Sequence, residues 1–435
     1  MEEWREANKQ KTFYGWRIVG AVFILATFGW GLGFYGPPVF LQAVHEARGW
    51  SLATVSIGVT IHFLFGAVVV AYIPKLYETF GVPAVAKAGC FALAAGIAGW
   101  AWACEPYQFY AATLLSGAGW GTMGAAAVNA IVAPWFVRER PKALSAAYNG
   151  ASVGGIVFSP LWAEAIRLFG FPVASIVIGI ITVTTIWMLA GVYYAKSPAK
   201  MGLNADGDAR GVSIAPATCH PVKPLAGKQL WTDWCFITLA AGMALGLFAQ
   251  IGLLAHLFSL LVPALGVQVA GFAAAGATAA AIAGRTLVGW LIPPKADRRL
   301  FACGSYGVQI LGSLVLLLAA GDNVSLLWLG VVLFGAGIGN ATSLPPLIAQ
   351  VEFANADVLR AVALIVAISQ GTYAFAPAAF GLIRELAPPW SATSPGGAPL
   401  LFIAAALIQA LAVIAFLSGR RREGRPTSGS SLLRR

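Results

Sequence analysis

Residues 107–133, YQFYAATLLSGAGWGTMGAAAVNAIVA, form an uncharged run, and the next ten residues, PWFVRERPKA, carry three basic side chains. A transmembrane helix needs roughly 20 mainly apolar residues. Loops rich in lysine and arginine stay in the cytoplasm. The two segments therefore predict a membrane span followed by a cytoplasmic loop.

Eleven further runs of this kind occur along the chain. The twelve predicted spans are 18–41, 54–78, 84–104, 107–133, 142–168, 172–195, 231–261, 267–293, 299–320, 324–350, 359–385 and 398–418. The composition agrees, because 59% of the residues are hydrophobic and only 10% are charged, against about 25% charged in a soluble domain. The sequence predicts an all-α polytopic membrane protein.

The basic residues orient the predicted spans. The chain has 28 lysine and arginine residues, which lie in the two termini and in alternate loops. The exceptions are Arg48, Arg167 and Arg384 in the opposite loops, and Arg285 inside a span. This bias predicts a multi-pass protein of the inner (plasma) membrane, within the lipid bilayer, with both termini cytoplasmic. The net charge of +11 is then a topology signal, and no nucleic-acid partner is expected.

The two halves of the chain resemble each other. The segment GAGWG at 117–121 recurs as GAGIG at 335–339. The longest polar stretch between spans leaves six spans on each side. We expect an N-terminal six-helix bundle (1–195), a cytoplasmic inter-domain loop (196–230), a pseudo-symmetric C-terminal six-helix bundle (231–418) and a basic disordered tail (419–435). Paired halves of this kind are typical of transporters that bind substrate at the interface near the midplane.

Four short segments carry a likeness to a known family. They are YGW at 14–16, GPPVF at 36–40 with GWS at 49–51, PWF at 134–136 with RERPKAL at 138–144, and MGLNADGD at 201–208. In these segments the chain resembles the major facilitator superfamily (MFS) and, within it, bacterial monocarboxylate porters and oxalate/formate antiporters. The resemblance implies the MFS fold, and alternating access by rocking of the two bundles. The family's acidic loop motif is degenerate after span 2. After span 8 it is better kept, in Asp297, Arg298 and Arg299, which the resemblance identifies as a gating loop.

Arg285 is the main charge inside a predicted span. It lies eight residues before Pro293, or about 12 Å from the cytoplasmic end of span 8 at about 1.5 Å per residue. A charge at the bilayer centre costs roughly 2.5–3.5 kcal/mol. A guanidinium can bind a carboxylate with two parallel hydrogen bonds. We therefore interpret Arg285 as the anchor for an anionic substrate. The alternative is that Arg285 extends to the cytoplasmic interface and only helps gate the loop.

The resemblance supports this assignment and also limits it. Monocarboxylate porters carry an arginine in span 8 at what looks like this position. Their aspartate one turn earlier is replaced here by Ala281, and their lysine in span 1 by Pro37 and Pro38. Oxalate/formate exchangers have a lysine in span 11, where this chain has Gln370 and Tyr373. A single cationic anchor suits a monoanion better than a dianion.

Other polar side chains in the spans are candidates for the same cavity. We predict that Tyr35, Asn129, His256, Gln370 and Tyr373 bind substrate with Arg285. His62 and His256 are the candidates for proton coupling, because imidazole titrates between about pH 5 and pH 8. The alternative for each is a hydrogen-bonded interior histidine.

Span 1 has its own irregularity. Gly29, Gly31, Gly33 and Gly36 precede the pair Pro37-Pro38, and a proline pair frees backbone carbonyls, which is tolerated only inside protein or beside a cavity. This predicts either a bendable helix or a plain kink.

Taken together, these features predict a secondary transporter that moves a small organic anion, and a monocarboxylate fits best, by symport or antiport. A co-transported proton remains open. The alternative is an exporter of neutral or cationic apolar compounds, in which Arg285 is a gate. An enzyme would need convergent His, Cys or carboxylate groups at one depth, which the spans do not offer. The sequence has no nucleotide-binding loop and its five cysteines are scattered, so neither a cofactor nor a metal is expected. We expect a monomer.

Overall fold

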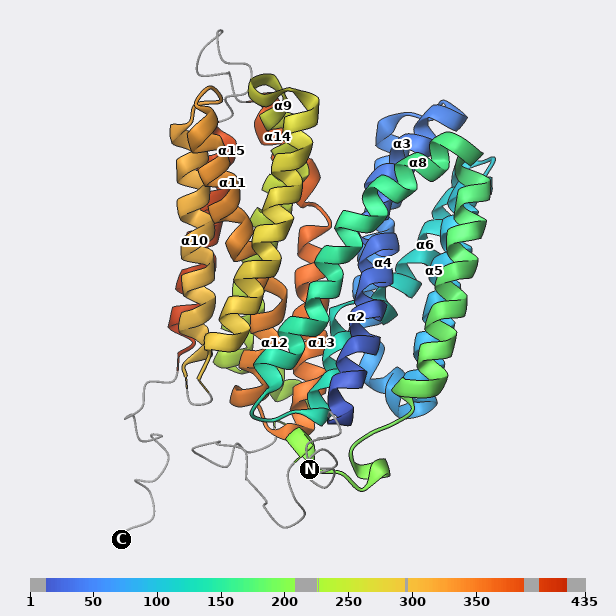
Figure 1. Cartoon of the computed structure of the whole chain (residues 1–435), viewed down its shortest axis with the longest axis vertical. Helices are drawn as coiled ribbons and strands as arrows, with labels where there is room; N and C mark the ends of the chain where they lie inside the picture. Colours follow the sequence, from blue (N-terminus) through green and yellow to red (C-terminus); the bar gives the residue numbers. More distant parts are fainter. Residues whose placement is uncertain (1–12, 208–224, 226, 294–295, 387–398, 421–435) are drawn as a thin grey trace, which may run out of the picture.

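A computed structural model describes residues 13–207, 225, 227–293, 296–386 and 399–420 (Figure 1). The inter-domain loop falls partly, and the predicted basic tail almost wholly, outside the described residues. The helices of the N-terminal half are α2 (Tyr14–Gly33), α3 (Gly36–Arg48), α4 (Leu52–Phe80), α5 (Val82–Trp102), α6 (Pro106–Met123), α7 (Ala125–Val132) and α8 (Arg140–Leu189). Those of the C-terminal half are α9 (Trp234–Leu291), α10 (Arg298–Leu318), α11 (Val324–Ile338), α12 (Asn340–Glu352), α13 (Asn355–Tyr373), α14 (Ala376–Leu386) and α15 (Pro399–Ser418).

The helices confirm the prediction of twelve membrane-spanning segments. Ten helical stretches in the described part of the chain are long and apolar enough to cross a membrane. One of them, Arg140–Tyr194, has 55 residues, or about 80 Å of helix, which is too long for one crossing of a core of about 30 Å. The chain turns back within it at Gly170, where φ is 76°. The α6–α7 pair adds the twelfth crossing. Gly266, with a φ of 74°, makes the equivalent turn within α9. Only glycine adopts this backbone conformation without strain.

The twelve segments form two bundles, one from each half of the sequence (Figure 1). The bundles meet where α8 packs on α9 and where α4 packs on α13. Many large apolar side chains face outward from the helices, such as Phe91, Ile180, Phe272 and Leu314. This pattern is what contact with lipid requires. The protein is therefore a multi-pass membrane protein.

Several spans are broken in the middle. Span 1 breaks between Gly33 and Gly36, span 4 at Gly124, span 10 at Gly339, and span 11 between Tyr373 and Ala376. Spans 4 and 10 are the two that carry the repeated glycine segments, so the resemblance between the halves extends to where their helices break.

The inter-domain loop is fastened to the N-terminal bundle by Asp206. Its carboxylate accepts hydrogen bonds from the backbone amides of Val137, Arg138 and Glu139, at 2.8–3.3 Å. The Asp206 side chain is only 3% exposed. In the C-terminal half, the Asp357 carboxylate accepts from the backbone amide of Leu225 at 2.8 Å. Both ends of the loop are therefore held by a carboxylate.

Candidate functional site

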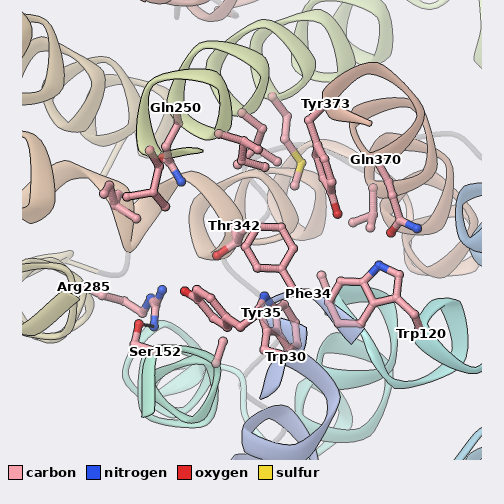
Figure 2. Close-up of a pocket in the computed structure, with 18 residues that line it drawn as sticks. Trp30, Phe34, Tyr35, Trp120, Ser152, Gln250, Arg285, Thr342, Gln370 and Tyr373 are labelled. Atoms are coloured by element: carbon pink, nitrogen blue, oxygen red, sulfur yellow. Dashed lines mark hydrogen bonds between the residues drawn. The ribbon is translucent and has the colours of Figure 1, made fainter. Parts of the chain in front are cut away.

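A small cavity lies between the two bundles, beside the breaks in spans 1, 4, 10 and 11 (Figure 2). Its volume is about 70 Å³. The N-terminal bundle contributes side chains from α2, the α2–α3 junction, α6, α7 and α8, and the C-terminal bundle contributes side chains from α9, α11, α12 and α13. The residues labelled in Figure 2 are Trp30, Phe34, Tyr35, Trp120, Ser152, Gln250, Arg285, Thr342, Gln370 and Tyr373.

Arg285 reaches this cavity from α9 and is only 4% exposed. Its Nε donates to the carbonyl of Gly339 at 2.6 Å, at the break between α11 and α12. Its Nη1 donates to three acceptors in α8: the carbonyl of Tyr148 at 2.6 Å, Asn149 Oδ1 at 3.1 Å and Ser152 Oγ at 3.4 Å. Its Nη2 makes no hydrogen bond within the described residues. The guanidinium is thus held on one side and has a free pair of N–H groups on the other.

A glycine lets Arg285 come this close to α11. A Cβ atom at Gly339 would lie 2.3 Å from the carbonyl oxygen of Ala281 and 2.8 Å from Arg285 Cβ. Any larger residue would push the two helices apart, so the second glycine segment serves helix packing at the cavity wall.

The cavity has a polar end and an aromatic end. At the polar end, the Tyr35 hydroxyl points toward Arg285 (Figure 2) and has no hydrogen-bond partner in the described part of the chain. At the aromatic end, the rings of Trp30 and Trp120 meet edge to face with centroids 5.0 Å apart. Phe34 packs against Tyr373 in the same way, at 6.1 Å. The charged donor is therefore at the polar end, while at the aromatic end the buried Trp120 Nε1 also has no hydrogen-bond partner among the described residues.

The charge of Arg285 is not balanced at the cavity. None of the residues that line it is acidic. The Gln250 side chain also faces the cavity (Figure 2), and its buried Oε1 has no partner among the described residues. A buried cation without a counter-ion is costly, and the lining residues leave that cost uncompensated.

Four of the residues predicted from the sequence meet at this cavity: Arg285, Tyr35, Gln370 and Tyr373. Gln370 also ties the bundles together, because its Nε2 donates to the carbonyl of Phe63 in α4 at 3.0 Å. Its amide therefore helps to shape the wall.

The other predicted residues lie away from the cavity lining. Asn129 Nδ2 donates to the carbonyl of Ala125 in its own helix, at 3.0 Å, and to the hydroxyl of Tyr148 in α8. His256 lies 3.1 Å from the carbonyl of Pro377 in α14. His62 is 1% exposed and contacts the carbonyl of Gly33 and the hydroxyl of Ser116.

Sequence reasoning missed several lining residues, namely Trp30, Phe34, Trp120 and Ser152. A weak signal was present. Trp30 and Phe34 are four residues apart and so share one helix face, and Tyr35 follows at the break. Aromatic residues in spans also face lipid, however, so spacing alone does not place them at a cavity.

Below the cavity the two bundles are joined along a line of contacts that we call the α8–α9 seam. The Ser145 hydroxyl donates to the carbonyl of Arg285 at 2.8 Å. Asn149 Nδ2 donates to Thr286 Oγ1, also at 2.8 Å. Lys142 Nζ lies 5.3 Å from the ring centroid of Trp290. These residues lie near the start of α8 and the end of α9, so the seam is closed at the end of the molecule where α2 begins (Figure 1).

The residues expected to form a gating loop lie at the start of α10, within the C-terminal bundle. Arg299 is 1% exposed, and its Nε and Nη2 donate to the Glu352 carboxylate at 2.6 and 2.8 Å. Asp297 accepts from Arg420 at 2.6 Å, and Arg298 donates to the carbonyl of Leu347. These bonds join α10 to α12 and to the end of α15.

The sequence profile of the Major Facilitator Superfamily matches residues 19–377, which is most of the chain. The chain belongs to the Major Facilitator Superfamily. Among solved structures, it is similar to a variant of the Escherichia coli fucose:proton symporter FucP. The two share 16% sequence identity with a TM-score of 0.62, over 92% of this chain and 98% of FucP. At this identity the likeness concerns the fold. No curated protein matches.

Membership of this superfamily makes the protein a transporter. The cavity between its two bundles is therefore the candidate substrate site, because MFS halves carry their substrate site at their interface near the midplane.

Proposed function

We propose that this MFS transporter moves a small monocarboxylate across the cytoplasmic membrane, with Arg285 and Tyr35 as the groups that bind the carboxylate. The proposal is carried by one observation. A buried guanidinium with a free Nη2, and a tyrosine hydroxyl without a partner, face one cavity that has no acidic lining residue. A carboxylate accepts hydrogen bonds from both donors and neutralises the charge.

The size of the cavity favours a short anion. Its volume of about 70 Å³ is about half of the 150 Å³ or so of an engineered cavity that holds benzene. A carboxylate with a body of a few carbon atoms fits without rearrangement of the walls. The aromatic end supplies an apolar surface for that body, and a second carboxylate would find no cation there.

The closed α8–α9 seam supports alternating access. With both termini in the cytoplasm, as the basic loops predict, the seam closes the cytoplasmic end of the pathway. Return to the inward-facing state requires that the bonds of Ser145, Asn149 and Arg285 across the seam break together. We propose that one monomer carries out the whole cycle.

The aromatic walls formed by Trp30, Phe34 and Trp120 favour a second candidate function, export of a neutral apolar compound. In that case Arg285 would serve only the seam. A cationic substrate is a poorer match, because it would face an uncompensated guanidinium.

Uptake into proteoliposomes tests the proposal. Labelled formate, acetate, propionate, pyruvate and lactate are offered with and without a pH gradient, with the corresponding amides and alcohols as neutral competitors. Competition by carboxylates, but not by neutral isosteres, is expected. Competition by apolar neutral compounds alone would overturn the proposal in favour of the second candidate. Dependence on the pH gradient would show that a proton is co-transported.

A further inference from the structure

The break in span 1 leaves backbone carbonyls without their helical partners, and the carbonyl of Gly33 is one of them. In an α-helix the carbonyl of Gly33 would accept a hydrogen bond from the amide of residue 37, but Pro37 has no N–H. His62 of α4 fills this place, with Nε2 2.9 Å from the Gly33 oxygen. A residue 29 positions along the chain thus replaces the lost bond.

The second ring nitrogen of His62 is held as well. Nδ1 lies 2.8 Å from Ser116 Oγ in α6, and that hydroxyl accepts from Trp100 Nε1 at 3.0 Å. Since the Gly33 carbonyl can only accept, Nε2 carries a proton. In the neutral ring Nδ1 is an acceptor for the Ser116 hydroxyl, which also lies 3.1 Å from the carbonyl of Thr113. Both ring nitrogens are therefore used within the bundle, and the orientation of the ring is fixed.

The break held by His62 presents the candidate binding residue. The amides of Phe34 and Tyr35 both donate to the carbonyl of Trp30, at 3.0 and 2.8 Å, which makes the turn tight. Tyr35 then points its hydroxyl toward Arg285 (Figure 2). The neighbour of His62, Phe63, packs on Phe34 with ring centroids 6.0 Å apart.

We propose that His62 is a positioning residue, which holds the break in span 1 so that the Tyr35 hydroxyl faces Arg285. Its effect on transport rests on the proposed function. Its effect on the backbone of residues 31–36 does not, because the Gly33 bond exists without substrate.

Two substitutions separate the roles of the ring nitrogens. In His62→Gln the amide nitrogen takes the place of Nε2 and can still donate to Gly33. In His62→Asn it takes the place of Nδ1, and the bond to Gly33 is lost. Amide hydrogen exchange of residues 31–36 is measured on the purified, substrate-free proteins, with His256→Asn as the control for loss of an imidazole at another helix break.

His62→Asn is expected to speed exchange of residues 31–36 about tenfold, the cost of one unsatisfied buried acceptor. His62→Gln and His256→Asn should leave this segment close to wild type. Equal exchange in His62→Asn and wild type would overturn the proposal, and so would equal acceleration in both His62 variants. Size-exclusion profiles of all three variants exclude misfolding as the cause.

A double-mutant cycle with pyruvate uptake tests the link to Tyr35. His62→Asn and Tyr35→Phe should each raise KM about tenfold. The double variant should be no worse than Tyr35→Phe alone, because His62 acts through that hydroxyl. If the two increases in KM multiply in the double variant, His62 does not act through the Tyr35 hydroxyl and the positioning role is wrong. If Tyr35→Phe itself leaves KM unchanged, the proposed function fails, while the exchange experiment still decides what His62 does to the break.

Discussion

The Nη1 of Arg285 in α9 donates to the backbone carbonyl of Tyr148 in α8, 2.6 Å away. The same side chain therefore faces the cavity and joins the two bundles. When the seam opens, the bonds to α8 are lost and the guanidinium keeps only the Gly339 carbonyl. Under the proposed function, a carboxylate bound at the free Nη2 would compensate for these lost bonds, and substrate binding would be linked to the movement of the bundles.

The first prediction concerns the seam. A Cβ atom at Gly289 would lie 2.6 Å from Ser145 Cβ and 3.2 Å from the carbonyl oxygen of Pro141. Gly289→Ala should therefore hinder closure and lower the maximal transport rate severalfold, with insertion unchanged, since overpacking costs about 1–3 kcal/mol. Uptake into proteoliposomes measures the maximal transport rate. Gly304→Ala is the matched control, because a Cβ there meets nothing within 4 Å. Equal rates in the two variants would show that the seam does not limit the cycle.

A second prediction concerns the ion pair between Arg299 and Glu352. The arginine is 1% exposed and the Glu352 side chain 16% exposed. Glu352→Gln leaves a buried guanidinium without its counter-ion, and loss of one partner of a buried pair costs about 3–5 kcal/mol. A clear fall in the melting temperature in detergent is expected. Glu164→Gln breaks the exposed pair with Arg167 and should not shift the melting curve. Similar melting of both variants would mean that the buried pair contributes little.

The third prediction concerns Asp206, which has a φ of 58°. Asparagine tolerates this conformation but lacks the charge that three backbone amides share. Asp206→Asn should loosen residues 136–139 and speed tryptic cleavage after Arg138, with the affinity for substrate unchanged. Timed proteolysis of the purified protein measures the effect. Cleavage at the wild-type rate would argue against a fastening role for this carboxylate.

The spans and the importance of Arg285 could be predicted because charges and unpaired backbone groups within a bilayer carry a large free-energy cost. An uncharged run such as 107–133 has few alternatives to a span, and a charge inside one stands out. The break in span 1 could also be expected, from Pro37 and Pro38. Its partner His62 could not, since nothing local links α4 to the carbonyl of Gly33.

The contents of the cavity were harder to predict. Asn129 and Gln370 look alike in the sequence, as single amides in apolar spans. In the fold, Asn129 bonds to its own helix and to the Tyr148 hydroxyl of α8, within the N-terminal bundle, while Gln370 reaches across to α4 beside the cavity. Helix rotation decides between these outcomes, and the packing of neighbouring helices, rather than local pattern, sets that rotation.

Uptake by Arg285→Gln, with the carboxylate that the wild-type protein transports fastest, tests the central claim most directly. Two charge-assisted hydrogen bonds are worth about 1.5–3 kcal/mol each, so transport should fall at least about 100-fold. Arg384→Gln removes the same charge at a site where the side chain bonds only the Ser259 hydroxyl among the described residues, and it should transport like the wild type. If Arg285→Gln inserts, folds and transports carboxylates at the wild-type rate, Arg285 does not bind the substrate and the anion proposal is wrong.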